Sequence, residues 1–370
     1  MKIFTHTFIV ISVIFLASAL FYPLPTFYIT GPSQALSAES SESLDSQEAK
    51  VWASRDQCEE VVTKGGHMAP VKATTLRLGT WNVRWFPIGM PEAKPGDDSQ
   101  RTDLEWLACT MLWMQVDIWA IQESLDTSEA QNAWKKVIKL LQEKSGGTWR
   151  WSPQSCGRPN DHHIGYLWNA GRVTLSQFDS LWQFNVKAES SQHPCEGGLR
   201  PGHYARVQSG EEGGVDFHLI ALHLKSGPTV DGVEKRHRAL NQIDNVIRPL
   251  LEQDQDVVIL GDLNTMGAGD WKSQGYELKS VRRQVAKEKP GFHDLPPTPQ
   301  CTHYFRGRGG WLDHVIVAKD MQEVIEVSAK VSGYCAVAGC KRIKGDYPLA
   351  YRRLSDHCPV IFEIRNRDED

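Results

Sequence analysis

Polar side chains stand at the ends of several apolar runs in this sequence, where they could act together. The run DVVIL (256–260) is followed by Gly261 and then by Asp262 and Asn264. Polar groups carried on apolar strands are costly to bury unless they have partners. We therefore expect such residues to lie together, where they can bind one another, a metal ion and a substrate. The other residues in this position are Asn82, Glu123, His223, Lys225, Asp313, Asp356 and His357.

The oxygen-bearing members of this set predict a site for a hard divalent cation. Carboxylate and amide oxygens suit Mg²⁺ or Mn²⁺ better than zinc, with Ca²⁺ as an alternative structural ion. Such a cation neutralises phosphate oxygens and stabilises a leaving oxyanion, which points to phosphoester hydrolysis. The predicted oxygen donors are Asn82, Glu123, Asp262, Asn264, Asp313 and Asp356.

Two histidines supply the acid–base chemistry that hydrolysis requires. His223 and His357 titrate near neutral pH and can move protons to and from water. Asp313 begins another apolar run and has no obvious partner of opposite charge nearby in the sequence. We therefore expect Asp313 to accept a hydrogen bond from His357 and to hold its other nitrogen toward an attacking water.

Strands and helices alternate along the chain, which predicts an α/β fold in one domain over residues 75–366. Residues 39–74 have a Ser- and Glu-rich start that predicts a linker or N-terminal arm, and residues 367–370 form a frayed acidic tail. The regions 177–203 and 265–310 are expected to be loops with some local structure. Apolar runs predict strands at 76–83, 117–123, 163–169, 215–224, 256–260, 311–317 and 357–364, and helical spacing predicts helices at 104–112, 127–144 and 240–251.

Residues 1–38 are expected to direct export. The apolar run Phe8–Phe21 is followed by small residues, as in a secretory signal peptide, although an uncleaved segment would be a membrane anchor. Eight cysteines fit a periplasmic or secreted protein. Their spacing predicts a Cys335–Cys340 bridge and favours a Cys156–Cys195 bridge. Cys58 would tie down the N-terminal arm, whereas Cys109 and Cys358 suit buried thiols as well as bridges.

The joint pattern resembles the endonuclease/exonuclease/phosphatase superfamily. The resemblance rests on six motifs in order along residues 80–360, namely TWNVRWF, AIQE, ALHLKSG, ILGDLNT, WLDHVIV and LSDHCPV. It implies a four-layer αββα sandwich of two packed, mainly antiparallel sheets flanked by helices. The histidine His223 favours deoxyribonuclease I-like members over apurinic endonucleases, which usually carry Asn there.

The same resemblance implies roles for the strand-end residues. Asn82 and Glu123 would hold the metal with Asp356 nearby, and Asp262 and Asn264 would orient the nucleophile and the phosphate. His357 would be the general base, paired with Asp313. One departure is that the phosphate-binding arginine of deoxyribonuclease I has no clear counterpart, so the substitutes considered are Arg158, His162 and His163.

The substrate is inferred from charge. The net charge of the whole chain is −4, so a polyanion must be bound by a local basic patch. Basic residues close to the catalytic motifs favour a nucleic acid and hence an exported nuclease. The alternatives are a secreted phospholipid or sugar-phosphate phosphodiesterase or phosphatase, with membrane lipid as substrate, and an inactive binding protein. No protein partner can be inferred. The predicted substrate-binding residues are Lys225, Arg306, Arg308, Arg352 and Arg353, with Lys341, Arg342 and Lys344 lying between the last two pairs.

Overall fold

Two mixed β-sheets pack face to face and carry most of the core. The computed structural model describes residues 43–69, 71–89, 98–287 and 291–369. One sheet has seven strands in the order β10 (Pro297–Thr298), β14 (Ala329–Val331), β15 (Val360–Arg365), β1 (Thr75–Phe86), β2 (Ile118–Ser124), β4 (His163–Asn169) and β3 (Trp149–Pro153). The other has six in the order β5 (Val173–Leu181), β6 (Gly202–Ser209), β7 (Asp216–His223), β8 (Val257–Asp262), β13 (Asp313–Ala318) and β9 (Phe292–Asp294).

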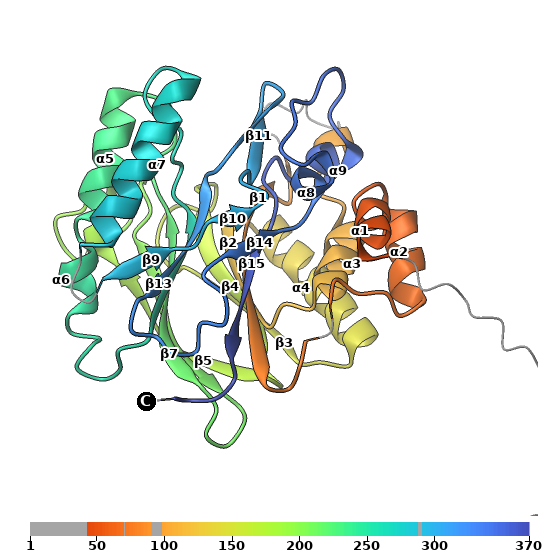
Figure 1. Cartoon of the computed structure of the whole chain (residues 1–370), viewed down its shortest axis with the longest axis horizontal. Helices are drawn as coiled ribbons and strands as arrows, with labels where there is room; N and C mark the ends of the chain where they lie inside the picture. Colours follow the sequence, from red (N-terminus) through yellow and green to blue (C-terminus); the bar gives the residue numbers. More distant parts are fainter. Residues whose placement is uncertain (1–42, 70, 90–97, 288–290, 370) are drawn as a thin grey trace, which may run out of the picture. The chain divides into compact units, whose positions relative to one another are not determined.

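Helices cover the outer face of each sheet (Figure 1). Those beside the seven-stranded sheet are α3 (Leu104–Met114) and α4 (Ser128–Ser145), and those beside the six-stranded sheet are α5 (Val230–Leu240), α6 (Ile243–Ile247) and α7 (Trp271–Val285). Most strand pairs are antiparallel, but β1–β2, β7–β8 and β10–β14 are parallel. The predicted αββα sandwich is therefore confirmed. The remaining elements are α1 (Leu44–Val51), α2 (Arg55–Thr63), α8 (Tyr334–Ala338), α9 (Leu349–Arg353), the hairpin strands β11 (His303–Phe305) and β12 (Arg308–Gly310), and 3₁₀ turns at Asp98–Gln100, Trp182–Phe184 and Glu196–Gly198.

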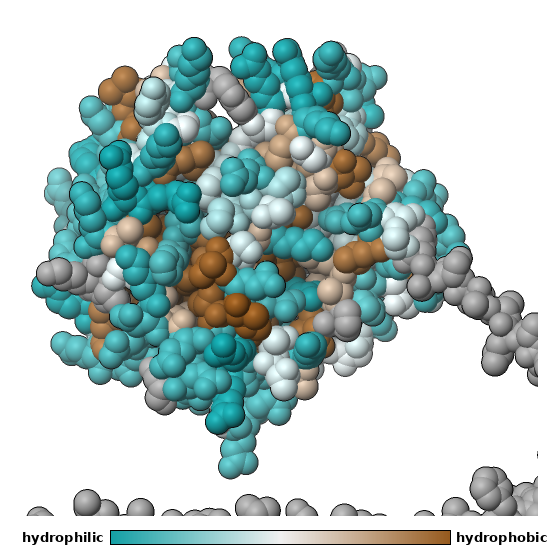
Figure 2. All heavy atoms as spheres, in the orientation of Figure 1, coloured by the Kyte–Doolittle hydropathy of each residue, from teal (hydrophilic) through white to brown (hydrophobic). Residues whose placement is uncertain are grey.

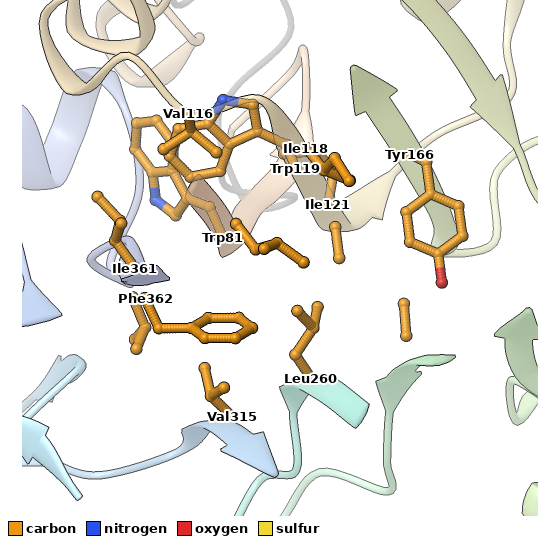
Figure 3. Close-up of a cluster of buried hydrophobic side chains, with 14 of the residues drawn as sticks. Trp81, Val116, Ile118, Trp119, Ile121, Tyr166, Leu260, Val315, Ile361 and Phe362 are labelled. Atoms are coloured by element: carbon orange, nitrogen blue, oxygen red, sulfur yellow. The ribbon is translucent and has the colours of Figure 1, made fainter. Parts of the chain in front are cut away.

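Apolar side chains from both sheets fill the space between them. Figure 3 shows Phe362 of β15 pointing toward Leu260 and Val315 of the opposite sheet. All three side chains are buried, and burying each one stabilises the fold by roughly 1.5–3 kcal/mol. On the face shown in Figure 2 most of the surface is hydrophilic, and apolar side chains gather near the centre, where Figure 1 shows strands of both sheets.

The N-terminal arm is helical rather than a linker. Ser43 and Ser54 cap α1 and α2, because their hydroxyls accept from the backbone N–H groups three residues on. Trp52 between the helices is buried and packs edge-on against Trp81, with ring centroids 5.8 Å apart. The Ser- and Glu-rich composition hid this amphipathic segment. The end of the chain is also held, since the backbone N–H of Glu369 donates to Glu323 Oε1 (2.9 Å).

Several helices and strands lie in regions where loops were predicted. The predicted helix at 240–251 also differs from the structure. Helix α7 was missed because its buried face is partly polar. Glu277 forms a buried two-pronged ion pair with Arg236 of α5 (2.7 and 2.8 Å), so a charged residue shares the buried face with Val281 and Val285. The 240–251 segment holds the last residue of α5, Leu240, and the five residues of α6, which are followed by turns. The region 177–203 holds the end of β5, two 3₁₀ turns and the first two residues of β6, and the rest is loop as predicted.

Four disulfides join the cysteines. Cys156–Cys195 is confirmed, but the predicted Cys335–Cys340 bridge is wrong. Cys335 lies on the buried side of α8 and bonds to Cys358 just before β15, whereas Cys340 follows the end of α8 and bonds to Cys301. The fourth bridge, Cys58–Cys109, ties α2 to α3. Within the described residues no helix is long and apolar enough to cross a membrane, and the run Phe8–Phe21 lies outside them.

Removing the Cys58–Cys109 bridge should destabilise the whole unit. The variant carrying both Cys58→Ala and Cys109→Ala is expected to lose about 2–4 kcal/mol of unfolding free energy, because the bridge constrains the unfolded chain. Urea denaturation measures this loss, and non-reducing peptide mapping checks the pairing. An unchanged denaturation midpoint would show that the N-terminal helices contribute nothing through this bridge.

Candidate active site

The ends of four central strands meet at one edge of the sandwich. In each sheet two parallel neighbours end side by side, so their last residues point to the same place. These ends carry Asn82 and Glu123 in one sheet and His223 and Asp262 in the other. Strand β13 runs antiparallel to β8 and begins there, because Asp313 pairs in register with Asp262. The segment before β15, which carries Asp356 and His357, approaches β1 in the same way.

The backbone at these strand ends adopts conformations that ordinary residues avoid. Gly261 has φ 139°, and a Cβ there would lie 2.0 Å from the carbonyl oxygen of Leu222. Glycine therefore allows β8 to approach β7 closely just before Asp262. Glu123 and Asn264 have φ values of 61° and 54°. Each such left-handed residue costs about 1–2 kcal/mol, a strain that proteins commonly keep at functional sites.

Asn82 holds two carboxylates in place. Its Nδ2 donates to Glu123 Oε1 (3.0 Å) and to Asp262 Oδ2 (3.0 Å). Its Oδ1 accepts from the backbone N–H of Arg84 (2.9 Å). Asn82 therefore orients the acids that surround it. Its predicted role as a metal ligand stays a prediction.

Glu123 and Asp356 are two half-buried carboxylates of the cluster, and each lies in a group that could hold a metal ion, Glu123 with two histidines and Asp356 with two others. Burial and the negative charge of Asp356 raise the pKa of Glu123 to about 7. Burial would also raise the pKa of Asp356, but a hydrogen bond from His303 and the charge of His357 lower it below its ordinary value. Two neighbouring carboxylates that repel each other in a buried site are stabilised by a cation, so this donor set fits Mg²⁺ or Mn²⁺.

His357 and Asp313 form a tight pair. His357 Nδ1 donates to Asp313 Oδ2 (2.8 Å), and its Nε2 lies 3.8 Å from Asp262 Oδ2. Its backbone is fixed as well, since Trp81 Nε1 donates to the His357 carbonyl (3.1 Å). Burial alone would lower the pKa of His357, but the charges of Asp313 and Asp262 raise it to about 10. The imidazole is therefore protonated at neutral pH unless a nearby positive charge opposes these carboxylates, and its Nε2 is turned toward the carboxylate cluster.

His223 and Asn264 complete the far side of the cluster. His223 Nε2 lies 3.7 Å from Glu123 Oε1 and 3.6 Å from Asp262 Oδ2. Burial, with the nearby charge of Arg200, keeps the pKa of His223 well below its ordinary value, so this imidazole is neutral. Asn264 is fixed by its backbone N–H, which donates to Asp262 Oδ1 (2.8 Å), and by its Nδ2, which donates to the Leu224 carbonyl (3.2 Å).

Two functional candidates were missed in the sequence. Arg200 donates to the carbonyls of His223 (3.0 Å) and Leu224 (2.9 Å), and the charges of Glu123 and Asp262 act on it. His303 lies with its Nε2 3.6 Å from Asp356 Oδ2, and its ring centroid is 4.5 Å from that of His357. Both residues fall in regions expected to be loops. The signal that the sequence offered for Arg200 was an arginine just before strand β6, which pairs with β7.

The three expected substitutes for a phosphate-binding arginine are separated. His162 joins the site, with its Nδ1 3.6 Å from Glu123 Oε1. Arg158 is exposed and pairs with Asp161 (3.1 Å), and the ring of His163 contacts the carbonyls of Gln154 and Arg158. Arg200, which was not predicted, is close enough for the charges of Glu123 and Asp262 to act on it, as Arg84 is for Asp356.

A cavity of about 870 Å³ opens over the cluster. Glu123, Asp262, Asn264, Asp356 and His357 line its base, and Phe305, Arg306, Arg308 and Arg342 line its rim. Arg306 and Arg308 are therefore where a substrate would pass. The other three predicted substrate-binding residues, Lys225, Arg352 and Arg353, are not among the residues that line this cavity. Arg353 pairs with Asp103 (3.6 Å), and the Arg352 carbonyl accepts from Arg84. Lys225 Nζ donates to the Ser226 carbonyl.

Comparison with known proteins gives a family match and a fold match. A model of the endonuclease/exonuclease/phosphatase family matches residues 79–357. An endonuclease/exonuclease/phosphatase from Bacteroides vulgatus superposes with a TM-score of 0.52 at 14% identity, covering 80% of this chain and 100% of its own. The human Nocturnin catalytic domain, solved with bound sulfate, gives 0.50 at 13% identity, covering 80% and 96%. These identities establish similarity of fold alone. No curated protein sequence matches the chain.

Proposed function

The chain belongs to the endonuclease/exonuclease/phosphatase family, and we propose that it is an exported, divalent-metal-dependent phosphodiesterase that cleaves nucleic acid. One observation carries the proposal. The His357–Asp313 pair (2.8 Å) faces a buried carboxylate cluster at the base of a cavity whose rim bears three arginines. This arrangement supplies a base for water, oxygen donors for a cation and positive charge for a polyanion.

Glu123 and Asp356 would hold the cation, with Asn82 orienting Glu123 through its amide nitrogen. A bound Mg²⁺ or Mn²⁺ supplies charge stabilisation for the non-bridging oxygens and for the leaving oxygen. Positive charge at this place also opposes the carboxylates that raise the pKa of His357, so the imidazole loses its proton more readily there.

The residues of this chain divide the remaining work. His357 accepts the proton of the attacking water at Nε2, and Asp313 holds the opposite nitrogen and stabilises the imidazolium that forms. Asp262 and Asn264 orient the water and the phosphate. Arg200 and the neutral His223 lie on the other side of the cluster, where they can donate to phosphate oxygens. The site therefore holds the reacting groups in place before the substrate arrives.

The rim favours nucleic acid over the lipid alternative. Arg306, Arg308 and Arg342 line the cavity together, and several arginines along one surface suit a chain of phosphates. The segment SLWQFNV (180–186), a candidate for lipid contact, offers no exposed apolar hairpin. Its Phe184 is buried, and Leu181 and Trp182 are half-buried.

Export is inferred from the cysteines. All eight form disulfides in the structure, an arrangement that persists in oxidising compartments. The signal or anchor predicted over residues 1–38 is part of the same proposal, which places the mature protein in the periplasm or outside the cell.

A comparison of substrates tests the proposed function. The purified protein with Mg²⁺ should cleave plasmid or single-stranded DNA at least 10-fold faster than it hydrolyses sphingomyelin in vesicles, because only the polyanion engages all three rim arginines. The His357→Ala protein, prepared in the same way, reveals any contaminating nuclease. Faster hydrolysis of sphingomyelin would favour the lipid alternative over the nuclease. If both activities persisted in EDTA, the metal-dependent mechanism would be wrong.

A further inference from the structure

The β11–β12 hairpin stands at the mouth of the cavity in a fixed conformation. Phe305 pairs with Arg308, so Arg306 and Gly307 form a two-residue turn. Both turn residues have positive φ (50° and 75°), as in the type I′ turns that match the twist of a hairpin. Gly307 suits this position, because a Cβ there would lie 2.4 Å from the Ile343 carbonyl oxygen. In Figure 1 the hairpin rises between α7 and the α8–α9 region.

The segment 339–347 braces this hairpin. The Cys301–Cys340 disulfide joins the two at their base. At the tip, Gly307 N–H donates to Tyr347 Oη (2.6 Å), and Ile343 N–H donates to the Gly307 carbonyl (2.9 Å). Tyr304 Oη donates to the Lys341 carbonyl between them (2.8 Å). The hairpin therefore presents its other face to the cavity as a rigid surface.

That other face carries rings that lead outward from the catalytic pair. Side chains alternate along a strand, so His303 and Phe305 share one face while Tyr304 turns toward the brace. The His303 ring lies against the His357 ring, with centroids 4.5 Å apart. Phe305 is the next residue on the same face and is 61% exposed, although large aromatic side chains are usually covered. An exposed aromatic ring on a rigid support has a face available for a ligand.

Positive charge surrounds the exposed ring. The Arg306 guanidinium lies over Phe305, with Cζ 5.2 Å from the ring centroid. Arg342, from the brace, and Arg308 line the same cavity. An aromatic ring set among arginines is the combination that binds single-stranded nucleic acid, because the ring stacks with a base while the cations contact phosphates.

We propose that Phe305 stacks with an unpaired nucleobase next to the scissile phosphate, so that the preferred substrate is single-stranded nucleic acid. This inference rests on the proposed nuclease function and names its substrate class. In a duplex the base faces are hidden within the stack, and only an unpaired base can lie on this ring. The rings of His303 and Phe305 guide the strand, and Arg306 and Arg342 contact its phosphates on the way to His357.

Kinetics of Phe305 variants test the stacking. For a single-stranded oligonucleotide, Phe305→Ala should raise KM about 5- to 100-fold, since stacking on an aromatic ring is worth about 1–3 kcal/mol per base. Phe305→Tyr should retain the wild-type KM because its ring still stacks. A small phosphodiester that has neither a base nor any other aromatic ring should show no difference in KM between the Phe305→Ala and Phe305→Tyr proteins. Tyr276→Ala serves as the matched control, because Tyr276 is 75% exposed on α7 and is not among the cavity-lining residues.

Base removal in the substrate gives a second, independent measurement. Oligonucleotides with a single abasic residue at each position around the cleavage site should lose affinity for the wild-type protein at one position. The Phe305→Ala protein should show no loss at that position, because the stacking partner is already absent. An equal abasic penalty in both proteins would mean that the base stacks elsewhere and would overturn the inference.

The remaining outcomes separate this inference from the proposed function. Wild-type cleavage of DNA with an unchanged KM in Phe305→Ala would remove the stacking role and leave the nuclease intact. Loss of binding to sphingomyelin vesicles in Phe305→Ala, with no DNA cleavage by the wild type, would make the ring a lipid contact and overturn both. Equal preference of the wild type for duplex and single strands would contradict the substrate class alone.

Discussion

The His357→Ala protein should lose at least about 10²-fold in kcat, and up to about 10⁴-fold, on any phosphodiester, because general-base catalysis is typically worth that much. Binding should change little, so KM should stay near the wild-type value. Steady-state hydrolysis of bis(p-nitrophenyl) phosphate measures both constants. His193→Ala is the matched control, since His193 is an exposed histidine outside the cavity. A His357→Ala protein near full rate would end the proposed mechanism.

Asp313 should act through His357 rather than independently. Asp313→Asn keeps the shape of the side chain but removes the charge that accepts from His357 Nδ1 (2.8 Å). This variant should also lose activity, and the double variant should lose far less than the product of the two single losses. Multiplicative losses would show that the two residues do not work as a pair. The unfolding midpoint of each variant should be recorded, because Asp313 is fully buried.

Metal removal should abolish activity. EDTA is expected to stop hydrolysis, and either Mg²⁺ or Mn²⁺ should restore it, because the half-buried carboxylates of Glu123 and Asp356 repel each other until a cation binds. Glu123→Gln should raise the Mg²⁺ concentration for half-maximal rate at least about 10-fold, as expected when a metal-binding group is weakened. Its fold should survive, since the substitution also removes a buried charge.

The metal prediction has a readout that does not depend on catalysis. Mg²⁺ should raise the Tm of the wild-type protein, because a ligand that binds only the folded state stabilises it. This shift should be much smaller in Glu123→Gln. Glu143→Gln is the matched control, since Glu143 lies on the exposed face of α4 and pairs with Lys139 (3.7 Å). Full activity in EDTA, or an equal Tm shift in the Glu123 and Glu143 variants, would contradict a cation at this cluster.

The central strands and the residues at their ends could be predicted from the sequence for one physical reason. Strands buried on both faces read as continuous apolar runs, so a polar residue directly after such a run is conspicuous. Asp262 after VVILG and Glu123 after IWAIQ are examples. Because β1 and β2 are parallel neighbours, as are β7 and β8, the polar ends within each sheet lie side by side, and the packing of the two sheets brings the two pairs together.

The rest depends on contacts between distant segments, which composition does not record. Helix α7 buries the charged Glu277, paired with Arg236, beside Val281 and Val285, so its buried face is less apolar than helical spacing rules expect. Cys335 and Cys340 are neighbours in sequence but leave α8 in different directions. Arg200 gains its place from the carbonyls of His223 and Leu224, and no spacing rule connects it to them. The direction of the Asn82 amide likewise follows from the Arg84 N–H, not from the motif.

Hydrolysis in H₂¹⁸O tests most directly the claim that His357 activates a water for attack on phosphorus. With Mg²⁺ and a single-stranded oligonucleotide, the wild-type protein should place one ¹⁸O atom on the phosphate-bearing end formed by each cleavage and none on the hydroxyl end, as mass spectrometry can show. The His357→Ala protein should form this labelled product at least about 10²-fold more slowly. Product phosphate without ¹⁸O, or equal rates of labelling by the two proteins, would contradict the account.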